Sequence, residues 1–508
     1  MAESLCNLPL FNLEFIKSYF CIVQNMIDSG KENERLVLTP SQREALNRLK
    51  TFVESGQEKV FILTGYAGTG KTTLMKMFIN WLSNGNHPFE LLASTGRAAK
   101  VLSNKAGSEA KTIHSCIYTF DAFNQDIERL VQEIDKHKGV DTTGQLLLQF
   151  ETLKADNEDY KQRIYIVDEA SMVPDVRDKN PTQAIFGTGK VLTDLLNYDA
   201  KGRFIFVGDA CQLPPMLQDF SPALAETYMQ NVHHVKVAHA RLQEIVRQED
   251  TNDIIQAAAR VRMLYEKPAR VTWAKFPLRG YQHIEIHPSQ ISLIDAYIRK
   301  VKEKGFNATT LICGSNRSCG MLSQLIRPAL GFHSGNLEVG ELLLVTQNNL
   351  PTGLMNGDFV KVVSIGNRIR QAELTFLHVE VCEMVTEQTY SLLLIEDILY
   401  SGMTNLSQIS QKALFIDFYR RMKDKKISSN SQEFKDYMKN DPYLNALRAV
   451  YGYAITCHKA QGGEWEDVYL DIPRYLSHNP THATYQWLYT AVTRASNRLH
   501  VVDAFFIA

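Results

Sequence analysis

A glycine-rich stretch of the chain has the residue types and the spacing that bind nucleotide phosphates. It runs from Gly65 to Thr72, reads GYAGTGKT, and matches every fixed position of the pattern G-x-x-x-x-G-K-[ST]. Glycines let consecutive backbone N–H groups turn toward phosphate oxygens, and the N-terminus of a following helix adds partial positive charge. In such a loop Lys71 reaches the β- and γ-phosphates of ATP, and the Thr72 hydroxyl binds Mg²⁺. The predicted cofactor-binding residues of the loop are Gly65, Gly68, Thr69, Gly70, Lys71, Thr72 and Thr73.

Two acidic residues stand where Mg²⁺ and an attacking water would need them. The apolar run 164–167 predicts a buried strand, and Asp168 and Glu169 follow at its carboxyl end. Asp168 can hold Mg²⁺ together with Thr72, and Glu169 can orient and deprotonate water. Two solvated acids at the end of a strand are the alternative interpretation, which the matched phosphate loop makes the weaker one.

Three further side chains are candidates to act on the γ-phosphate. Gln212 lies in the segment 208–215, directly after the predicted strand 204–207, and a neutral amide there can sense the phosphate without trapping it. Arg247 and Arg494 are candidate arginine fingers. For each arginine taken alone, a surface ion pair is the alternative.

A capping pattern precedes the phosphate loop. Thr39, Pro40 and Gln42 form a T-x-x-Q capping box at a helix start, which is a complete structural explanation by itself. The functional alternative is that Gln42 faces the adenine edge. The two interpretations do not exclude each other, and the sequence does not separate them.

The elements that must position these residues predict an α/β fold. Apolar strands such as 59–64 and 91–95 alternate with helical segments, and in an open parallel sheet the ligands gather at the carboxyl ends of the strands. The run 308–317 starts a second unit of the same kind, and the strand-rich segment after it predicts a small β-barrel. Residues 187–191 resemble the end of a second phosphate loop, but they lack its first glycine and its final Ser or Thr, so we reject them.

Composition bounds the partners and the compartment. The 508 residues are 44% hydrophobic and 22% charged with a net charge of -1, so nucleic acid would have to bind on local patches. The eight cysteines include no C-x-x-C pair, which argues against a structural zinc and against disulfides. No apolar run approaches the ~18 residues of a membrane helix, and no basic leader is present. We expect a cytoplasmic protein of a bacterial or phage-like host, without a membrane partner.

The motifs occur in the order typical of superfamily 1 helicases, and from about Thr39 to Ala504 the chain resembles the 5′→3′ branch, the RecD-like and Dda-like DNA helicases. The segment HKAQGGEW, 458–465, matches a family motif in which Glu464 resembles the residue that contacts the ribose. Ser94 departs from the family, which usually has proline there. The resemblance implies that the single-strand groove is lined by Ser94, Thr95, Thr112, His114, Pro214, Pro215, Asn316, His458 and Lys459.

The resemblance also implies the domain organisation, with ATP bound between two RecA-like cores. The expected parts are an N-terminal helical extension (1–35), a first core (36–118 and 163–235), an inserted arm with a strand-separating pin (119–162), a second core (236–338 and 450–508), a small β-barrel inserted in it (339–400) and a polar helical insertion (401–449).

The implied activity is that of a monomeric ATP-dependent 5′→3′ DNA helicase. It would translocate on single-stranded DNA, open duplex/single-strand junctions, and serve replication, repair or recombination. The expected catalytic residues are Lys71, Glu169, Gln212, Arg247 and Arg494. Two alternatives stay open at this point. One is an RNA helicase or translocase, and the other is an ATP-switched nucleic-acid-binding module that unwinds nothing.

Overall fold

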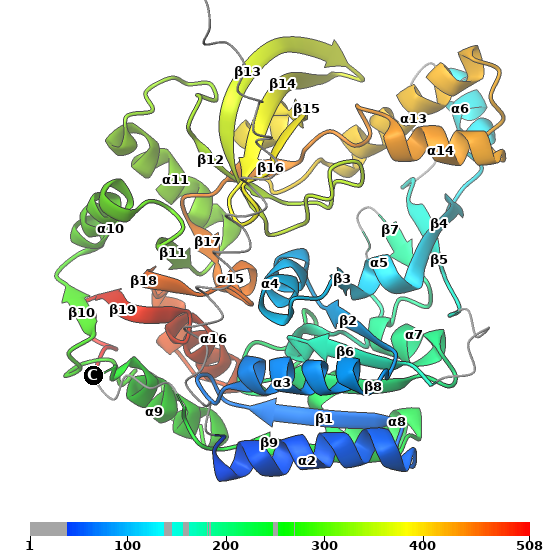
Figure 1. Ribbon diagram of the computed structural model, residues 1–508. Helices are drawn as coiled ribbons and strands as arrows, with labels where there is room; N and C mark the ends of the chain where they lie inside the picture. The colour runs from blue at the N-terminus through cyan, green and yellow to red at the C-terminus, as the bar shows by residue number, and fades with distance from the viewer. Residues whose placement is uncertain are drawn as a thin grey trace, which may run out of the picture.

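The computed structural model describes residues 38–136, 145–155, 162–179, 181, 184–246, 252–268 and 270–508. The helical extension expected over 1–35 lies outside these residues, as do Arg247 and parts of the inserted arm. Figure 1 shows two sheet-containing cores, with a separate antiparallel sheet above them and an arm to one side. Across the described ranges, no helix has the length and the apolar character to pass through a lipid bilayer.

The first core is built on a six-stranded parallel sheet with the strand order β3-β2-β6-β8-β1-β9. Its strands are β1 Val60–Gly65, β2 Phe89–Ala93, β3 Ala110–Thr112, β6 Ile164–Asp168, β8 Arg203–Gly208 and β9 Val237–Leu242. Strand β8 is buried along its whole length, which is why its sequence is a continuous apolar run. Because β9 pairs with β1, this sheet extends to Leu242, beyond the boundary expected at residue 235.

Helices connect these strands and include the one that follows the phosphate loop (Figure 1). They are α2 Pro40–Ser55, α3 Lys71–Asn84, α4 Gly96–Ala106, α5 Ile113–Ile117, α7 Val191–Tyr198 and α8 Glu226–His233, with 3₁₀ turns η1 Ala170–Met172 and η2 Pro222–Leu224. The loop 187–190 before α7 resembles a phosphate loop, but the Asp194 carboxylate accepts hydrogen bonds from the Thr188 N–H (3.0 Å) and hydroxyl (2.7 Å). An internal carboxylate thus satisfies these donors, which fits the rejection of this segment.

The second core contains a five-stranded parallel sheet with the order β10-β19-β18-β11-β17. Its strands are β10 Ile284–His287, β11 Thr309–Cys313, β17 Ile455–Thr456, β18 Trp465–Leu470 and β19 Ala495–Val502. Its helices are α9 Ile254–Glu266, α10 Gln290–Lys304, α11 Asn316–Leu330, α15 Cys457–Ala460 and α16 His482–Val492, with the 3₁₀ turn η3 Arg474–Ser477. The predicted α/β class with two parallel-sheet cores is therefore confirmed.

The strand-rich insertion is a five-stranded antiparallel sheet with the order β15-β14-β13-β12-β16. Its strands are β12 Leu342–Val345, β13 Phe359–Gln371, β14 Leu374–Glu383, β15 Thr389–Ile395 and β16 Ala449–Tyr451. The closed β-barrel predicted over 339–400 is not confirmed. Helix α12, Glu396–Tyr400, begins directly after β15, and the β15 end and the segment before β16 meet at one isolated bridge, Leu394 to Leu447. The edge strand β16 also comes from beyond residue 400.

The arm from the first core packs against helices from the second (Figure 1). The arm consists of a three-stranded sheet, β4 Tyr118–Phe123, β5 Leu148–Thr152 and β7 Ala184–Phe186, and of helix α6 Ile127–Lys136. The segment 401–449 forms helices α13 Gln408–Asp424 and α14 Gln432–Asn440. The rings of Phe123 and Phe415 meet edge to face with their centroids 5.3 Å apart, and Arg420 pairs with Asp135 at 2.6 Å.

Helix α4 joins the first core to the inserted sheet. The Lys100 Nζ lies 2.5 Å from Asp358 Oδ2 and 3.9 Å from Glu383 Oε1, and both acidic side chains are buried. The Arg97 guanidinium lies 4.5 Å from the Trp465 ring and 5.2 Å from the Phe359 ring. One helix of the first core thus contacts the inserted sheet through Asp358, Glu383 and Phe359, and the second core through Trp465.

Candidate nucleotide site between the two cores

The phosphate loop lies between β1 and α3, in the strand–loop–helix context expected from the sequence. Gly68 (φ 78°) and Gly70 (φ 76°) adopt left-handed backbone conformations, which strongly favour glycine. A Cβ at Gly70 would also lie 2.4 Å from the Gln42 amide nitrogen, so this position has no space for a side chain. The Thr69 hydroxyl donates to the Tyr66 carbonyl at 2.8 Å and closes the turn.

The Lys71 side chain folds back over the loop. Its Nζ donates to the Gly65 carbonyl (2.7 Å) and to the Tyr66 carbonyl (3.0 Å). These two carbonyl oxygens accept hydrogen bonds from the ammonium group, as the oxygens of a bound phosphate would. Thr72 is exposed and Thr73 half-buried in the first turn of α3, where the helix N-terminus favours anions.

Gln42 connects helix α2 to the phosphate loop. The predicted capping box is confirmed, because the Gln42 Oε1 accepts from the Thr39 N–H at 3.0 Å and the Thr39 hydroxyl accepts from the Gln42 N–H. The Gln42 Nε2 also donates to the Thr69 carbonyl at 3.1 Å, and the side chain is buried. The capping role is therefore formed, and the same amide supports the loop.

The acid pair lies at the end of β6, two strands from β1 in the sheet. Burial, together with the adjacent Glu169, raises the pKa of Asp168 to about 6, while the positive charge of Lys71 acts in the opposite direction. The phosphate loop and the acid pair follow β1 and β6 at the same edge of this parallel sheet. Glu169 has a left-handed backbone (φ 49°), which is uncommon for a residue with a Cβ.

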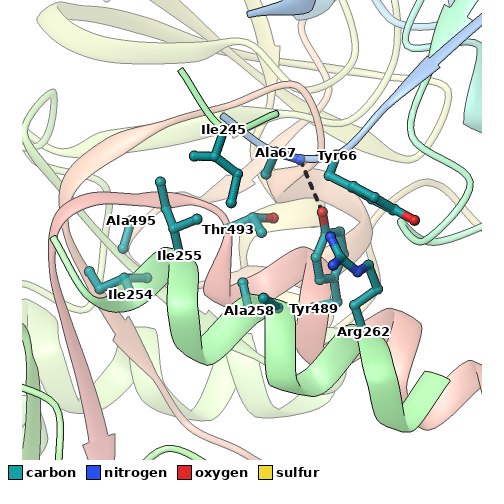
Figure 2. A pocket seen from close by; sticks show the side chains of 11 residues that line it. Tyr66, Ala67, Ile245, Ile254, Ile255, Ala258, Arg262, Tyr489, Thr493 and Ala495 are labelled. Atoms are coloured by element: carbon teal, nitrogen blue, oxygen red, sulfur yellow. Dashed lines mark hydrogen bonds between the residues drawn. The ribbon is translucent and has the colours of Figure 1, made fainter. Parts of the chain in front are cut away.

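A tyrosine from the second core reaches into this site. Tyr489 on α16 donates its hydroxyl to Asp209 Oδ2 at 2.8 Å. The same hydroxyl accepts from the Ala67 N–H of the phosphate loop at 3.0 Å (Figure 2). Burial, with the Asp209 carboxylate nearby, raises the pKa of Tyr489 well above its usual value, so the phenol stays a donor. One hydroxyl therefore links the second core to two motifs of the first.

The segment 208–215, which contains Gln212, also contacts the second core. The Leu213 N–H donates to the Thr490 hydroxyl at 2.9 Å, and its carbonyl accepts from Gln461 Nε2 at 3.0 Å. The Gln212 carbonyl accepts from Gln486 Nε2 at 3.2 Å, and the Gln212 side chain is buried. This segment is thus held by hydrogen bonds that cross between the cores.

A pocket opens beside the phosphate loop, between it and the helices α9 and α16 (Figure 2). The Arg262 guanidinium carbon lies 3.8 Å from the centre of the Tyr66 ring, and Arg241 approaches the same ring at 4.9 Å. The lining residues are Tyr66, Ala67, Ile245, Ile254, Ile255, Ala258, Ala259, Arg262, Tyr489, Thr493 and Ala495. Tyr489 and Arg262 were not identified from the sequence, because their partners in the loop are distant along the chain.

The two predicted arginine fingers have different outcomes. Arg247 lies outside the described residues. Arg494 follows α16, is 6% exposed, and donates to the Thr490 carbonyl (3.0 Å) and the Gly463 carbonyl (3.0 Å) of its own core. Glu464, next to Gly463, is exposed. Arg494 is thus bonded to Gly463, the residue before Glu464. Its role at the γ-phosphate remains a prediction.

The groove residues predicted in the first core lie at strand ends and helix starts. Thr95 is the N-cap of α4 and accepts from the Ala98 N–H at 3.3 Å, and Thr112 is the N-cap of α5 and accepts from the Ser115 N–H at 3.1 Å. The His114 ring packs on Phe186, and burial lowers its pKa. Ser94 is half-buried, whereas Pro214 and Pro215 are buried.

The groove residues predicted in the second core also lie at starts of helices. Asn316 is exposed at the first position of α11, and His458 and Lys459 are half-buried within α15. Burial lowers the pKa of both His458 and Lys459. A nucleic-acid contact for these residues remains a prediction.

Two family models match the chain. A model described as an AAA domain matches residues 37–273, and one described as the UvrD-like helicase C-terminal domain matches residues 451–502. The first range contains the phosphate loop and the acid pair, and the second contains Arg494. Together with a short match to a phage helicase, these two ranges make the chain similar to superfamily 1 helicases. The resemblance predicted from the sequence is confirmed.

The proteins that are similar to this chain differ in the share of the chain that they match. An uncharacterized protein of Methanocaldococcus jannaschii is 24% identical over 531 residues, which cover 98% of this chain and 40% of that protein. The ATP-dependent DNA helicase Dda of Enterobacteria phage T4 is 43% identical over 81 residues, which are 16% of this chain and 18% of Dda. The chain thus spans less than half of the length of these two relatives. A crystal structure of Pif1 helicase from Bacteroides, in complex with ADP-AlF3 and ssDNA, has 16% identity and a TM-score of 0.47, covering 92% of this chain and 93% of that one.

Proposed function

We propose that this protein is an ATP-dependent 5′→3′ DNA helicase that translocates on single-stranded DNA and separates the strands ahead of it. The observation that supports this most directly is the Tyr489 hydroxyl, which contacts the phosphate loop at Ala67 and the 208–215 segment at Asp209. A nucleotide that reshapes the loop would therefore act on a helix of the second core. Coupling hydrolysis to movement requires such a contact between the cores.

The residues around the loop fit ATP with Mg²⁺. Lys71 would exchange its two carbonyl partners for phosphate oxygens, and Thr72 with Asp168 supplies the oxygen ligands that Mg²⁺ prefers. When bound, Mg²⁺ neutralises charge on the phosphates. Glu169 would accept the proton of the attacking water, and the arginines would stabilise charge on the γ-phosphoryl group.

Single-stranded DNA is proposed as the track. The predicted groove residues come from both cores, from helix starts such as those of α4 and α11, where backbone N–H groups favour phosphate oxygens. Contacts of this kind are independent of sequence and depend strongly on salt. The arm that packs on α13 is proposed to carry the strand-separating pin.

Unwinding of tailed duplexes tests the proposal. With ATP and Mg²⁺, we expect the protein to open a duplex that has a 5′ single-stranded tail and to leave one with a 3′ tail closed. Lys71→Ala should abolish both hydrolysis and unwinding. Opening of the 3′-tailed duplex alone would overturn the proposed polarity.

Two comparisons separate the alternatives. Stimulation of hydrolysis by poly-dT should exceed stimulation by poly-U, and equal or greater stimulation by RNA would refute DNA as the track. Glu169→Gln should remove turnover while ATP binding remains. Unchanged turnover in that variant would favour a binding module that is switched by ATP.

A further inference from the structure

Three metal-binding side chains meet at the edge of the second-core sheet, away from the nucleotide site. Glu285 and His287 lie two residues apart on β10, so their side chains project from the same face of the strand. His500 lies on the neighbouring strand β19, directly opposite Glu285 in the register. This group of residues, Glu285, His287 and His500, is called the edge cluster below.

The distances within the edge cluster match those of a metal site. The His287 Nε2 lies 3.1 Å from the His500 Nδ1 and 3.7 Å from Glu285 Oε1, and the His500 Nδ1 lies 3.4 Å from Glu285 Oε2. Tetrahedral Zn²⁺ with bonds of about 2.0–2.1 Å holds its ligand atoms about 3.3 Å from one another. The three measured distances, 3.1, 3.4 and 3.7 Å, lie on both sides of that value. One ion can therefore contact both imidazoles and the carboxylate after small shifts of the side chains.

Polar and aromatic side chains lie against both imidazoles. The second nitrogen of His500, Nε2, faces Asp467 Oδ1 at 3.6 Å, and the second nitrogen of His287, Nδ1, faces the Ser292 hydroxyl at 3.4 Å. The Tyr469 ring stacks on His500 with a centroid distance of 4.1 Å and an angle of 3°. A carboxylate behind a metal-binding histidine is a common arrangement in zinc sites, because it fixes the ring and makes the ligand more basic.

Burial and access also suit a metal ion. His287 and His500 are 5% and 4% exposed, so both imidazoles are enclosed by the sheet and by the elements packed on it. The Glu285 side chain is 48% exposed, which leaves a route from solvent and a position for water as fourth ligand. Arg498, whose side chain is 47% exposed, lies 3.8 Å from Glu285 Oε2 and competes for the carboxylate.

The Nε2 of His500 makes no hydrogen bond within the described residues, and its closest carboxylate oxygen is the one of Asp467 at 3.6 Å. We propose that Glu285, His287 and His500 bind a divalent transition-metal ion of the Zn²⁺ class. Two imidazoles and one carboxylate favour Zn²⁺ or Co²⁺ over Mg²⁺, so this site is chemically separate from the nucleotide site. Strand β10 is an edge strand of four residues with β19 as its neighbour in the sheet. The ion would tie β10 to β19 and so secure the edge of the second core.

Co²⁺ titration of the full-length protein tests this site. After chelator treatment and in excess Mg²⁺, Co²⁺ should produce the visible absorption of a tetrahedral ion, and Zn²⁺ should displace it. Glu285→Gln removes an exposed ligand and should weaken Co²⁺ binding at least about tenfold. The matched control is Glu226→Gln, which breaks the surface pair of Glu226 with His239 (3.1 Å), where no third ligand lies within the described residues.

The outcomes separate a metal site from a hydrogen-bonded histidine pair. Tetrahedral Co²⁺ absorption that is lost in Glu285→Gln and retained in Glu226→Gln supports the proposal. Absence of that absorption, or equal Co²⁺ binding by the two variants, would overturn it. DNA-stimulated hydrolysis measured in parallel shows that each variant is folded, and it is expected to stay at the wild-type level in both.

Discussion

Removal of one hydroxyl, in the variant Tyr489→Phe, is predicted to uncouple the two cores. The hydroxyl makes two hydrogen bonds across the interface, to Asp209 Oδ2 at 2.8 Å and from the Ala67 N–H at 3.0 Å. Phenylalanine keeps the ring and its packing, so the substitution tests the hydrogen bonds alone. Tyr489 acts here as a positioning residue, since it contacts the loop from outside.

The magnitude follows from the burial of the two partners. Asp209 is 1% exposed, and a hydrogen bond to a buried charged group contributes about 1.5–3 kcal/mol. The Ala67 N–H is half-buried and can regain water, so its loss adds little. A loss of about 2 kcal/mol corresponds to about a 30-fold shift in the equilibrium between docked and undocked cores.

Steady-state hydrolysis at saturating poly-dT measures this effect. We expect kcat to fall by up to about 30-fold in Tyr489→Phe, while KM for ATP changes little, because the loop and Lys71 remain. Tyr485→Phe, one turn earlier on the same helix, is the matched control; Tyr485 is 1% exposed, and its hydroxyl makes no hydrogen bond within the described residues. If both variants hydrolyse ATP as the wild type does, Tyr489 does not couple the cores.

Three further perturbations give measurable outcomes. Burial and Glu169 raise the pKa of Asp168 to about 6, and Mg²⁺ binds the deprotonated carboxylate. The Mg²⁺ concentration for half-maximal hydrolysis should therefore rise about tenfold for each pH unit below 6. A Mg²⁺ requirement that does not change with pH would contradict this. Lys100→Met leaves Asp358 buried without its cation and should lower the free energy of unfolding by about 3–5 kcal/mol, measured in urea, with Asp358→Asn restoring much of the loss in the double variant. Phe415→Ala removes a ring that packs on the arm and should reduce duplex unwinding while poly-dT-stimulated hydrolysis persists; loss of both activities together would refute a separate role for the arm.

Local signals in the sequence were sufficient for the phosphate loop and for the strands beside it. The run 204–207 is apolar because β8 is buried along its length, and the residues 65–72 form their loop through glycine geometry and contacts within a few positions. The capping box of Thr39 and Gln42 is likewise a contact over three residues. Such features depend on neighbours along the chain, which a single sequence displays directly.

Contacts between distant segments left no such signal. Tyr489 and Ala67 are 422 positions apart, and His287 and His500 are 213 apart, so no spacing rule connects them. The argument against a structural zinc examined cysteine patterns and could not include ligands brought together by two parallel strands. The β-barrel prediction is not confirmed for a related reason, since the edge strand β16 joins the sheet only after the intervening helices α13 and α14.

The arrangement of α16 explains how one ATP could act on both cores. Tyr489 and Thr490 lie on this helix and contact the phosphate loop and the 208–215 segment, and Arg494 follows just after its end. Lys71 meanwhile is held by the carbonyls of Gly65 and Tyr66, next to Ala67. In the proposed function, phosphate oxygens replace those carbonyls as partners of Lys71, and the backbone beside Ala67 changes its contacts. We therefore expect the loop and α16 to rearrange together, with Arg494 following α16.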